Sequence, residues 1–366
     1  MMHTESAEPV GFPFTAIEGQ PQLQMALLLA AIDPLLGGVL VEGPRGTAKS
    51  TSARALASLL PAGRFVNLPL GATEEQLVGS IDLEAALQRS AVQFRAGLLA
   101  QAHQGILYVD EVNLLADGLV DLLLDVSASG INRVERDGVS HQHDARITLI
   151  GTMNPEEGQL RPQLLDRFGL FVRLENVPST AMRKAIVKTR MAFDADPRSF
   201  FAAHANAQAA LAARVAAARA VLVAIQWPDA VHDQVAQLCQ DAGVEGVRAD
   251  LVMLRAARAH AALQGREQVT FVDVQAVAEL ALAHRRTQGA PQSQEGDEPS
   301  PESGGAQTSQ PSGQRADQRA DQSTDAQQAP PSPQPANAQT WGEMSAPQAV
   351  PIQTVKALRP FSSKKA

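Results

Sequence analysis

The sequence predicts an α/β fold, a parallel sheet flanked by helices, followed by an all-helical domain and a disordered tail. Up to about residue 175, short apolar runs of strand length alternate with stretches of helical periodicity. Beyond Pro178 the periodicity is helical only, and from 289 to 340 there is no Val, Ile, Leu, Met, Phe, Tyr or Trp. We therefore expect an α/β domain over residues 1–177, a helical domain over 178–287 and a disordered tail over 288–366.

Short apolar runs separated by helical stretches are predicted to form the sheet. This order is typical of parallel strands, which place ligands at their carboxyl ends. A further region, Ile131 to His143, has Asp137-Gly138 at its centre and is predicted to be a β-hairpin. The strands expected in the sheet are 38–42, 64–68, 105–109, 147–151 and 170–174.

The expected helices are indicated by apolar residues at helical spacing. In the α/β part, Gln22 to Ile32 is one, and Asn113 is predicted to cap another whose buried face includes Leu122 and Val126. Cys239, the single cysteine, shares the apolar face of its helix and is expected in the core. The helices predicted after Pro178 are 179–192, 205–225, 229–241, 247–263 and 272–286.

The first strand is followed by a glycine-bearing loop and a helix opening at Lys49, a pattern that cradles phosphate. Backbone N–H groups face the anion, Lys49 reaches the outer phosphates and the Ser50 hydroxyl holds Mg²⁺. Where this pattern usually has glycine the chain has Ala48, so we expect Ala48 at negative φ and Gly46 in a left-handed position. A glycine-rich turn without a ligand is the alternative. The residues expected to bind ATP are Gly43, Pro44, Arg45, Gly46, Thr47, Ala48, Lys49, Ser50 and Thr51.

A pair of carboxylates, Asp110-Glu111, ends the third predicted strand about 60 residues after the loop. Asp110 can support the Mg²⁺ held by Ser50, and Glu111 can orient and deprotonate an attacking water. A solvated strand end is the alternative for such a pair. Together with the phosphate loop, the pair predicts an NTPase.

Composition excludes several other classes of protein. The 366 residues, 45% of them hydrophobic, suffice for one large or two medium domains. A net charge of −8 argues against a nucleic-acid partner. No apolar run reaches ~18 residues and no signal peptide opens the chain, so we expect neither a membrane span nor secretion. A single cysteine cannot form an internal disulfide, which suits the cytoplasm.

Several longer motifs carry a resemblance to a known family. Over about residues 12 to 285 the chain resembles the ATPase subunits of magnesium chelatase, within the AAA+ superfamily of P-loop NTPases. The motifs are Phe14-Thr15-Ala16-Ile17-Glu18-Gly19-Gln20, the loop at 43–50, Leu70 to Glu75, Gly105 to Leu115, Leu122 to Val126, Asn154-Pro155-Glu156-Glu157-Gly158 and Leu160 to Gly169.

The resemblance implies roles for three more residues. Asn154 is similar to the polar sensor that positions the water, and Arg167 to the finger that a subunit offers to its neighbour's γ-phosphate. Arg248 is similar to the second sensor, although Arg255 and Arg258 lie on the same predicted helix. Outside that context, Arg167 would be expected to pair with Asp166 or Glu175 on a surface.

The same resemblance implies partners and a metal-inserting activity. Such subunits form a ring, expected to be a hexamer, and drive a subunit with an integrin-type domain and a large tetrapyrrole-binding subunit. The complexes insert Mg²⁺ into protoporphyrin for chlorophyll, or Co²⁺ into a corrin-type ring for cobalamin. The sequence of this chain does not indicate which of the two metals is inserted. A MoxR-like remodelling chaperone and a nucleotide-binding scaffold without turnover are the alternatives.

Two patterns resemble metal motifs but are interpreted otherwise. Asp125-Val126-Ser127-Ala128-Ser129 matches the metal motif of integrin-type domains, yet it ends an amphipathic helix inside the α/β domain. His141 and His143 have the spacing of a ligand pair but no cysteine or carboxylate company, so a hairpin surface is expected there.

Overall fold

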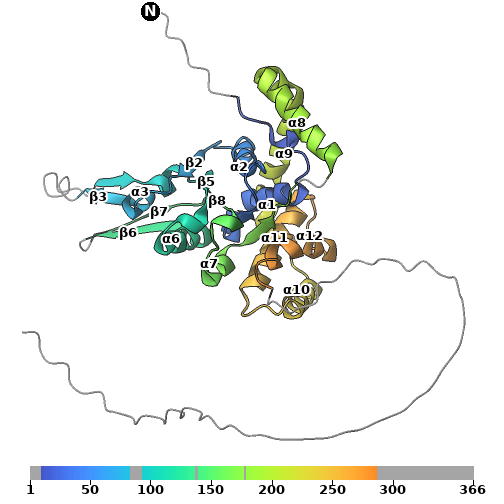
Figure 1. Cartoon of the computed structure of the whole chain (residues 1–366). Helices are drawn as coiled ribbons and strands as arrows, with labels where there is room; N and C mark the ends of the chain where they lie inside the picture. Colours follow the sequence, from blue (N-terminus) through green and yellow to red (C-terminus); the bar gives the residue numbers. More distant parts are fainter. Residues whose placement is uncertain (1–9, 83–92, 137–138, 177–178, 287–366) are drawn as a thin grey trace, which may run out of the picture. The chain divides into compact units, whose positions relative to one another are not determined.

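The computed structural model describes residues 10–82, 93–136, 139–176 and 179–286. Its main feature is a parallel sheet of five strands in the order β2-β5-β8-β1-β9 (Figure 1). The strands are β1 (Val39–Glu42), β2 (Phe65–Leu68), β5 (Ile106–Val109), β8 (Thr148–Met153) and β9 (Leu170–Arg173). Each lies within two residues of its predicted range, so the apolar runs were sufficient to find them.

The sheet is buried on both faces, which is why its strands are apolar runs instead of alternating patterns. Every residue of β1, β5 and β8 is buried. Neighbouring side chains of β1 enter different cores: Val39 and Val41 join one cluster, and Leu40 joins the other.

Helices of the α/β part cover the two faces of this sheet. The face of Val39 and Val41 packs with α1 (Pro21–Ile32) and α2 (Lys49–Ala57), and the face of Leu40 with α3 (Glu74–Val78), α5 (Leu98–Gln101) and α6 (Asp117–Ser129). A last short helix, α7 (Pro162–Arg167), precedes β9.

The second half of the chain is helical, as predicted. Its helices are α8 (Thr180–Ala195), α9 (Pro197–Val221), α10 (Asp229–Asp241), α11 (Arg248–Leu263) and α12 (Phe271–Leu282). The apolar faces of α9, α10, α11 and α12 continue the cluster that α1 forms on the sheet, and Cys239 lies in it, 5% exposed. The two parts therefore share one hydrophobic core, and the boundary at 177/178 stays a prediction.

Two helix starts were predicted wrongly. Asn113 does not cap α6; it lies in a 3₁₀ turn, Val112–Leu114, and α6 begins after Ala116. The chain leaves β5 through Glu111 at φ 52°, and this turn and an extended stretch separate Asn113 from the helix. Helix α9 begins eight residues before the predicted 205, because Asp196 accepts a hydrogen bond from the Ser199 N–H (3.1 Å) and Pro197 suits the first turn.

Two hairpins lie side by side beyond the sheet (Figure 1). The predicted one is β6 (Ile131–Arg136) with β7 (Val139–Asp144), and its centre at 137–138 lies outside the described residues. The other, β3 (Gly79–Asp82) with β4 (Gln93–Ala96), was not predicted. Its strands are four residues long and flank an undescribed segment, too short for a periodic signal.

One described helix, Pro197–Ala224, is long and apolar enough to cross a membrane by length and composition. The hydropathy of this helix comes largely from alanine, and Arg214 and Arg219 interrupt it. It packs against α1, α8 and α11. The predicted disordered tail, 288–366, lies outside the described residues.

Candidate functional site

Three strand ends meet at one edge of the sheet and form the candidate site. In the parallel register Glu42 of β1 pairs with Met153 of β8, and Val109 of β5 pairs with Gly151. The segments that follow these strands therefore start at the same edge: the glycine-bearing loop, Asp110-Glu111, and Asn154. This arrangement fits the expectation that parallel strands place ligands at their carboxyl ends, and the roles of the individual residues stay predictions.

Lys49 extends back along the loop to the strand ends. Its ammonium group donates to the carbonyls of Gly43 and Pro44, the latter at 3.4 Å, and to the Met153 carbonyl at 3.4 Å. Partial burial lowers the pKa of Lys49, and the nearby Asp110 opposes this shift. Thr47 closes the loop with a hydroxyl bond to the Pro44 carbonyl (2.9 Å).

The loop backbone bears out one expectation and overturns another. Gly46 is left-handed, φ 81°, as predicted, but Ala48 is left-handed too, at φ 59° and ψ 24°, and not at negative φ. The prediction for Ala48 was wrong because the residue stands before the first helical position, where the loop still turns. A left-handed alanine costs roughly 1–2 kcal/mol. Such strain is common in loops that hold ligands.

Other contacts fix the loop from outside. The Gln20 side-chain amide donates to the Thr47 carbonyl at 2.6 Å, which ties the segment before α1 to the loop. A Cβ on Gly43 would stand 2.8 Å from the Leu174 Cβ, so only glycine lets the loop pass β9 this closely. The backbone N–H groups of the loop and the start of α2 thus form a built cradle for an anion.

Asp110 is held by two hydroxyl groups, one from its own strand β5 and one from the neighbouring strand β8. Thr152 Oγ1 donates to Asp110 Oδ1 at 2.7 Å, and the Tyr108 hydroxyl donates to the same oxygen at 3.0 Å. Burial raises the pKa of Tyr108 to about 12, so the phenol stays a donor. The second carboxylate oxygen and the exposed Ser50 hydroxyl remain as hard oxygen ligands of the kind that Mg²⁺ prefers.

Glu111 belongs to a charged cluster that the sequence did not indicate. Burial and the neighbouring Glu157 raise its pKa, whereas a hydrogen bond from Arg45 lowers the pKa of Glu157. The Arg45 guanidinium pairs with Glu157 and lies 3.9 Å from Glu111 Oε1. Glu111 therefore holds its proton more readily than an ordinary carboxyl and is a stronger base when ionised.

Asn154 stands between these groups, 5% exposed. Its Oδ1 accepts from the Glu156 N–H at 3.4 Å and so begins a 3₁₀ turn over Pro155–Glu157. This turn brings Glu157 back toward Glu111. Asn154 directly follows β8, which lies beside β5, the strand that Asp110 follows.

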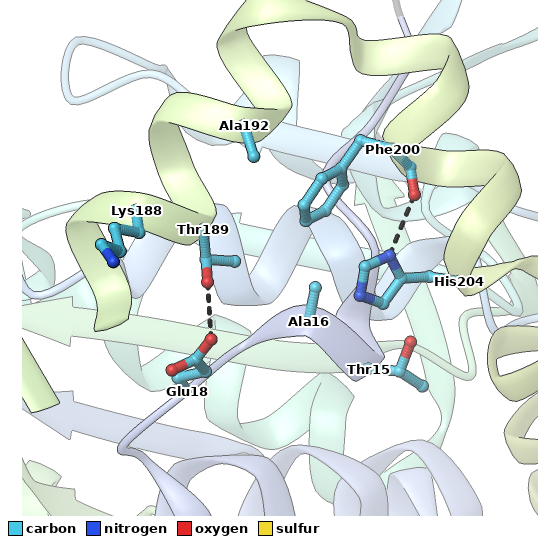
Figure 2. Close-up of a pocket in the computed structure, with 8 residues that line it drawn as sticks. All are labelled: Thr15, Ala16, Glu18, Lys188, Thr189, Ala192, Phe200 and His204. Carbon is cyan, nitrogen blue, oxygen red and sulfur yellow. Dashed lines mark hydrogen bonds between the residues drawn. The ribbon is translucent and has the colours of Figure 1, made fainter. Parts of the chain in front are cut away.

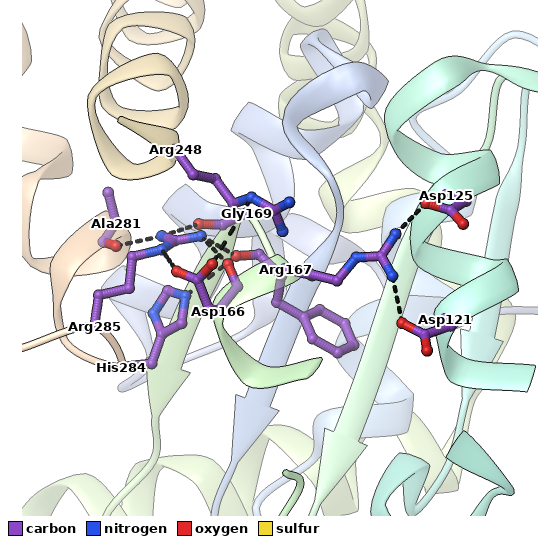
Figure 3. Close-up of polar contacts among 10 residues, drawn as sticks. Asp121, Asp125, Asp166, Arg167, Gly169, Arg248, Ala281, His284 and Arg285 are labelled. Carbon is purple, nitrogen blue, oxygen red and sulfur yellow. Dashed lines mark hydrogen bonds and ion pairs between the residues drawn. The ribbon is translucent and has the colours of Figure 1, made fainter. Parts of the chain in front are cut away.

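Arg167 ends α7 just before β9 begins, so it lies at the opposite edge of the sheet from the loop that follows β1. Figure 3 shows its side chain extended toward α6. Its guanidinium pairs with Asp121 and Asp125 of α6, and its side chain is 24% exposed. The alternative partners considered from sequence, Asp166 and Glu175, are not those it contacts. The sequence thus located the arginine but missed both carboxylates.

Arg248 begins α11 and approaches the same short helix. Its Nε lies 3.8 Å from Asp166 Oδ2, next to Arg167 in the chain. The other two arginines of α11 point elsewhere: Arg255 donates to the Leu35 carbonyl at 2.6 Å, and Arg258 lies 4.4 Å from the Trp227 ring centroid. Of the three arginines, Arg248 is the one placed beside Arg167.

A pocket of about 380 Å³ lies between the segment Thr15–Glu18 and helices α8 and α9 (Figure 2). Thr189 donates to Glu18 Oε1 across it at 2.6 Å, and His204 donates to the Phe200 carbonyl at 2.9 Å. The loop residues and the two carboxylates do not line it. It is therefore separate from the candidate site.

The two metal-like patterns are engaged in structural contacts. Asp125 pairs with Arg167, and Ser129 Oγ bonds the backbone of Ile131. His141 stacks on Phe94, with ring centroids 4.1 Å apart, and joins the two hairpins. Among the described residues no cluster of three His, Cys, Asp or Glu side chains could hold a metal ion.

Comparison with known proteins identifies the architecture. A family model of the AAA domain, dynein-related subfamily, matches residues 38–168, and a model of the AAA lid domain matches residues 232–303. A solved structure of the complex between subunits BchI and BchD of magnesium chelatase is 41% identical, covering 77% of this chain and 98% of that chain, with a TM-score of 0.45.

Curated relatives are similar over most of the chain. An uncharacterized protein of Mycobacterium tuberculosis is 52% identical over 281 residues, 75% of this chain but only 45% of that longer protein. The magnesium-chelatase 38 kDa subunit of Chlorobaculum tepidum is 45% identical over 316 residues, covering 75% of this chain and 81% of its own. That of Acidiphilium rubrum is 46% identical over 312 residues, covering 75% and 90%. With an AAA domain, a helical lid and this similarity, the chain belongs to the family of magnesium-chelatase ATPase subunits.

Proposed function

We propose that this protein is the ATP-hydrolysing subunit of a metal chelatase and drives the insertion of Mg²⁺ or Co²⁺ into a tetrapyrrole by separate subunits. The observation that carries the proposal is the meeting of Lys49, Asp110, Glu111 and Asn154 at one edge of a parallel sheet. The similarity to magnesium-chelatase subunits supports the choice among AAA proteins.

Lys49 and the loop backbone bind the phosphates of ATP in this proposal. The loop carbonyls that Lys49 now contacts are weak partners for a cation, and a phosphate oxygen is a stronger one. The Pro44 to Ser50 segment and Thr51 would surround the phosphates at the start of α2. Binding therefore depends on Lys49 in the ground state.

Glu111 removes the proton of the attacking water. Its raised pKa improves its strength as a base near neutral pH, and the Thr152 hydroxyl lies 3.3 Å from its backbone N–H. Asn154 orients the same water through its amide. Arg45 and Glu157 set the charge around Glu111 and so tune how readily it accepts the proton.

The residues present fit a magnesium ion. Ser50 offers a hydroxyl, and Asp110 offers a carboxylate whose orientation is set by Tyr108 and Thr152. Bound Mg²⁺ would neutralise charge on the transferring phosphoryl group. The chain's own contribution is to hold these two oxygen ligands at the start of α2 and the end of β5.

Arg167 and Arg248 act on the nucleotide of a neighbouring subunit in a ring, expected to be a hexamer. Both lie around α7, away from their own loop, and an arginine there can stabilise charge on a transferring phosphoryl group. Val247 and Leu251 flank Arg248 and are 71% and 59% exposed. Exposed apolar side chains beside functional arginines are typical of a contact surface.

The partners proposed are a chelatase subunit with an integrin-type domain and a large tetrapyrrole-binding subunit, in the cytoplasm. A MoxR-like remodelling chaperone is the second candidate, since the fold alone would serve it. Scaffolding without turnover is disfavoured because Glu111, Asn154 and Arg167 are all present.

The experiment combines the purified protein with the candidate partner subunits of the same genome, ATP and a porphyrin or corrin substrate. Insertion of Mg²⁺ and of Co²⁺ is followed in separate reactions by the absorbance of the tetrapyrrole. We expect ATP-dependent insertion of one metal, and none with Lys49→Ala.

Three outcomes separate the candidates. ATP hydrolysis that neither partner alters, with no insertion of either metal, would contradict the chelatase proposal. Accelerated unfolding of a protein substrate in its place would favour the chaperone. Tight ATP binding without hydrolysis under all conditions would favour the scaffold.

A further inference from the structure

Arg285, just after α12, directs four of its five guanidinium N–H donors to the segment that carries Arg167 and the fifth to Ala281 of α12 (Figure 3). Nε donates to Asp166 Oδ1 (3.1 Å), and Nη2 donates to the carbonyls of Asp166 (2.7 Å) and Phe168. Nη1 donates to the carbonyls of Gly169 (3.1 Å) and Ala281 (2.5 Å). A guanidinium has five such donors, so none is left for another partner.

Burying the charged guanidinium of Arg285 costs free energy of folding unless every one of its donors has a partner. The Arg285 side chain is 1% exposed, and burial lowers its pKa while Asp166 raises it. A buried charge that loses one partner is strongly destabilising. Lysine has three donors on a flexible stem and cannot reproduce a planar five-bond contact.

The segment held by Arg285 is also fixed from the sheet side. Phe168 is 1% exposed in the core, where a Cβ on Gly151 would stand 3.2 Å from its ring. Gly169 donates to the Gly37 carbonyl at 3.2 Å. The backbone on both sides of Arg167 therefore has one position, set jointly by the sheet and by the lid.

Asp166 connects the same contact to the second candidate arginine. Asp166 Oδ1 accepts the hydrogen bond from Arg285 Nε, while Arg248 Nε lies 3.8 Å from Asp166 Oδ2. Arg285 is thus the buried centre of a group with Arg167 and Arg248 at its edges.

We propose that Arg285 is a positioning residue that fixes the backbone around Arg167, so that the helical lid sets the place of the finger offered to the neighbouring subunit. The proposal rests on the role of Arg167 given above. Arg285 acts through the carbonyls of residues 166–169 and does not itself touch the nucleotide.

The test uses full-length Arg285→Lys and Arg285→Met, with Arg286→Met as the matched control. Arg286 is next in the chain, is exposed, and within the described part of the chain its guanidinium pairs with Glu279. A displacement of about 1 Å costs on the order of 10² in rate. We therefore expect kcat for ATP to fall about 10²-fold in both Arg285 variants, with the ATP dissociation constant within about two-fold, and no change in the control.

Mixing variants identifies which site Arg285 serves. Arg285→Met mixed with Lys49→Ala should recover activity, because the Lys49→Ala subunits supply a well-placed Arg167 to intact loops. Arg285→Met mixed with Arg167→Ala should stay inactive, because neither partner supplies the finger. Recovery in the second mixture and not in the first would overturn the proposal.

The pair Lys49→Ala and Arg167→Ala tests the premise separately. If mixed rings of that pair do not regain ATP hydrolysis, Arg167 does not act across subunits, and the proposal for Arg285 is wrong as well. If that pair recovers but Arg285→Met with Lys49→Ala does not, only Arg285 has been assigned wrongly. Loss of the folded state in both Arg285 variants, by circular dichroism and size exclusion, would show a purely structural residue and would also overturn the proposal.

Discussion

His284, the neighbour of Arg285, makes the stability of the protein depend on pH. Its Nε2 donates to the Phe168 carbonyl at 3.1 Å, so the neutral ring carries its proton there. Its Nδ1 is buried and has no hydrogen-bond partner among the described residues. Protonating Nδ1 would place a charge beside the Arg285 guanidinium without an acceptor, and His284→Gln, neutral at every pH, removes this possibility.

The size of the effect follows from the pKa. Burial, with the charge of Arg285, lowers the pKa of His284 from an ordinary 6.5 to about 3. Between these values the unfolded chain binds more protons than the folded one, so stability is full above about pH 6.5 and falls as pH falls. Between pH 7 and pH 5 the loss is at most about 2 kcal/mol in the free energy of unfolding.

The assay is urea unfolding of wild type and His284→Gln at pH 7 and pH 5. The wild type should lose about 2 kcal/mol more than the variant, since the other groups titrate alike in both. His232→Gln, at an exposed histidine, is the matched control and should follow the wild type. Parallel profiles for wild type and His284→Gln would refute the assignment of a neutral imidazole whose Nδ1 is buried.

Three further predictions test the site and the core. Lys49→Ala should abolish ATP binding, whereas Glu111→Gln should bind ATP but not hydrolyse it, because Lys49 contacts phosphate in the ground state and Glu111 acts only on the attacking water. Calorimetry measures the binding and a phosphate-release assay measures the hydrolysis. Normal turnover by Glu111→Gln would contradict the assignment of Glu111. Ala48→Gly should raise the free energy of unfolding by about 0.5–1 kcal/mol in urea titrations, because the relief of left-handed strain exceeds the entropy that glycine adds to the unfolded chain. A less stable variant would show that the methyl group of Ala48 is needed. Burial raises the pKa of Cys239 to about 12, so alkylation at pH 8 should be on the order of 10³-fold slower than in urea, and equal rates followed by mass spectrometry would contradict a buried thiol.

Much of the fold was predictable because its elements have strong local signals. The strands of the sheet are unbroken apolar runs, and the order of the chain forces their carboxyl ends to one edge. That edge places the phosphate loop, Asp110-Glu111 and Asn154 together without any further information. The helices after Pro178 follow from their apolar periodicity in the same way.

What could not be predicted depends on contacts between distant residues. The left-handed Ala48 is imposed by the loop and overrides the intrinsic preference of alanine. Arg45 and Glu157 are 112 residues apart, and nothing in either local sequence indicates the pair. Arg285 follows the end of α12, where a basic residue ordinarily interacts with the helix dipole from the surface. Nothing in the local sequence therefore indicates that Arg285 is buried against α7.

The paired carboxylates on Arg167 have a consequence for how it can be used. One guanidinium faces two aspartates, Asp121 and Asp125, so the group as a whole is an anion. If Arg167 meets a phosphate of the neighbouring subunit, one negative partner replaces another, and little Coulomb energy separates the two arrangements. Such an exchange is reversible within a single turnover, and because Asp125 is 70% exposed, dissolved salt can shift its balance.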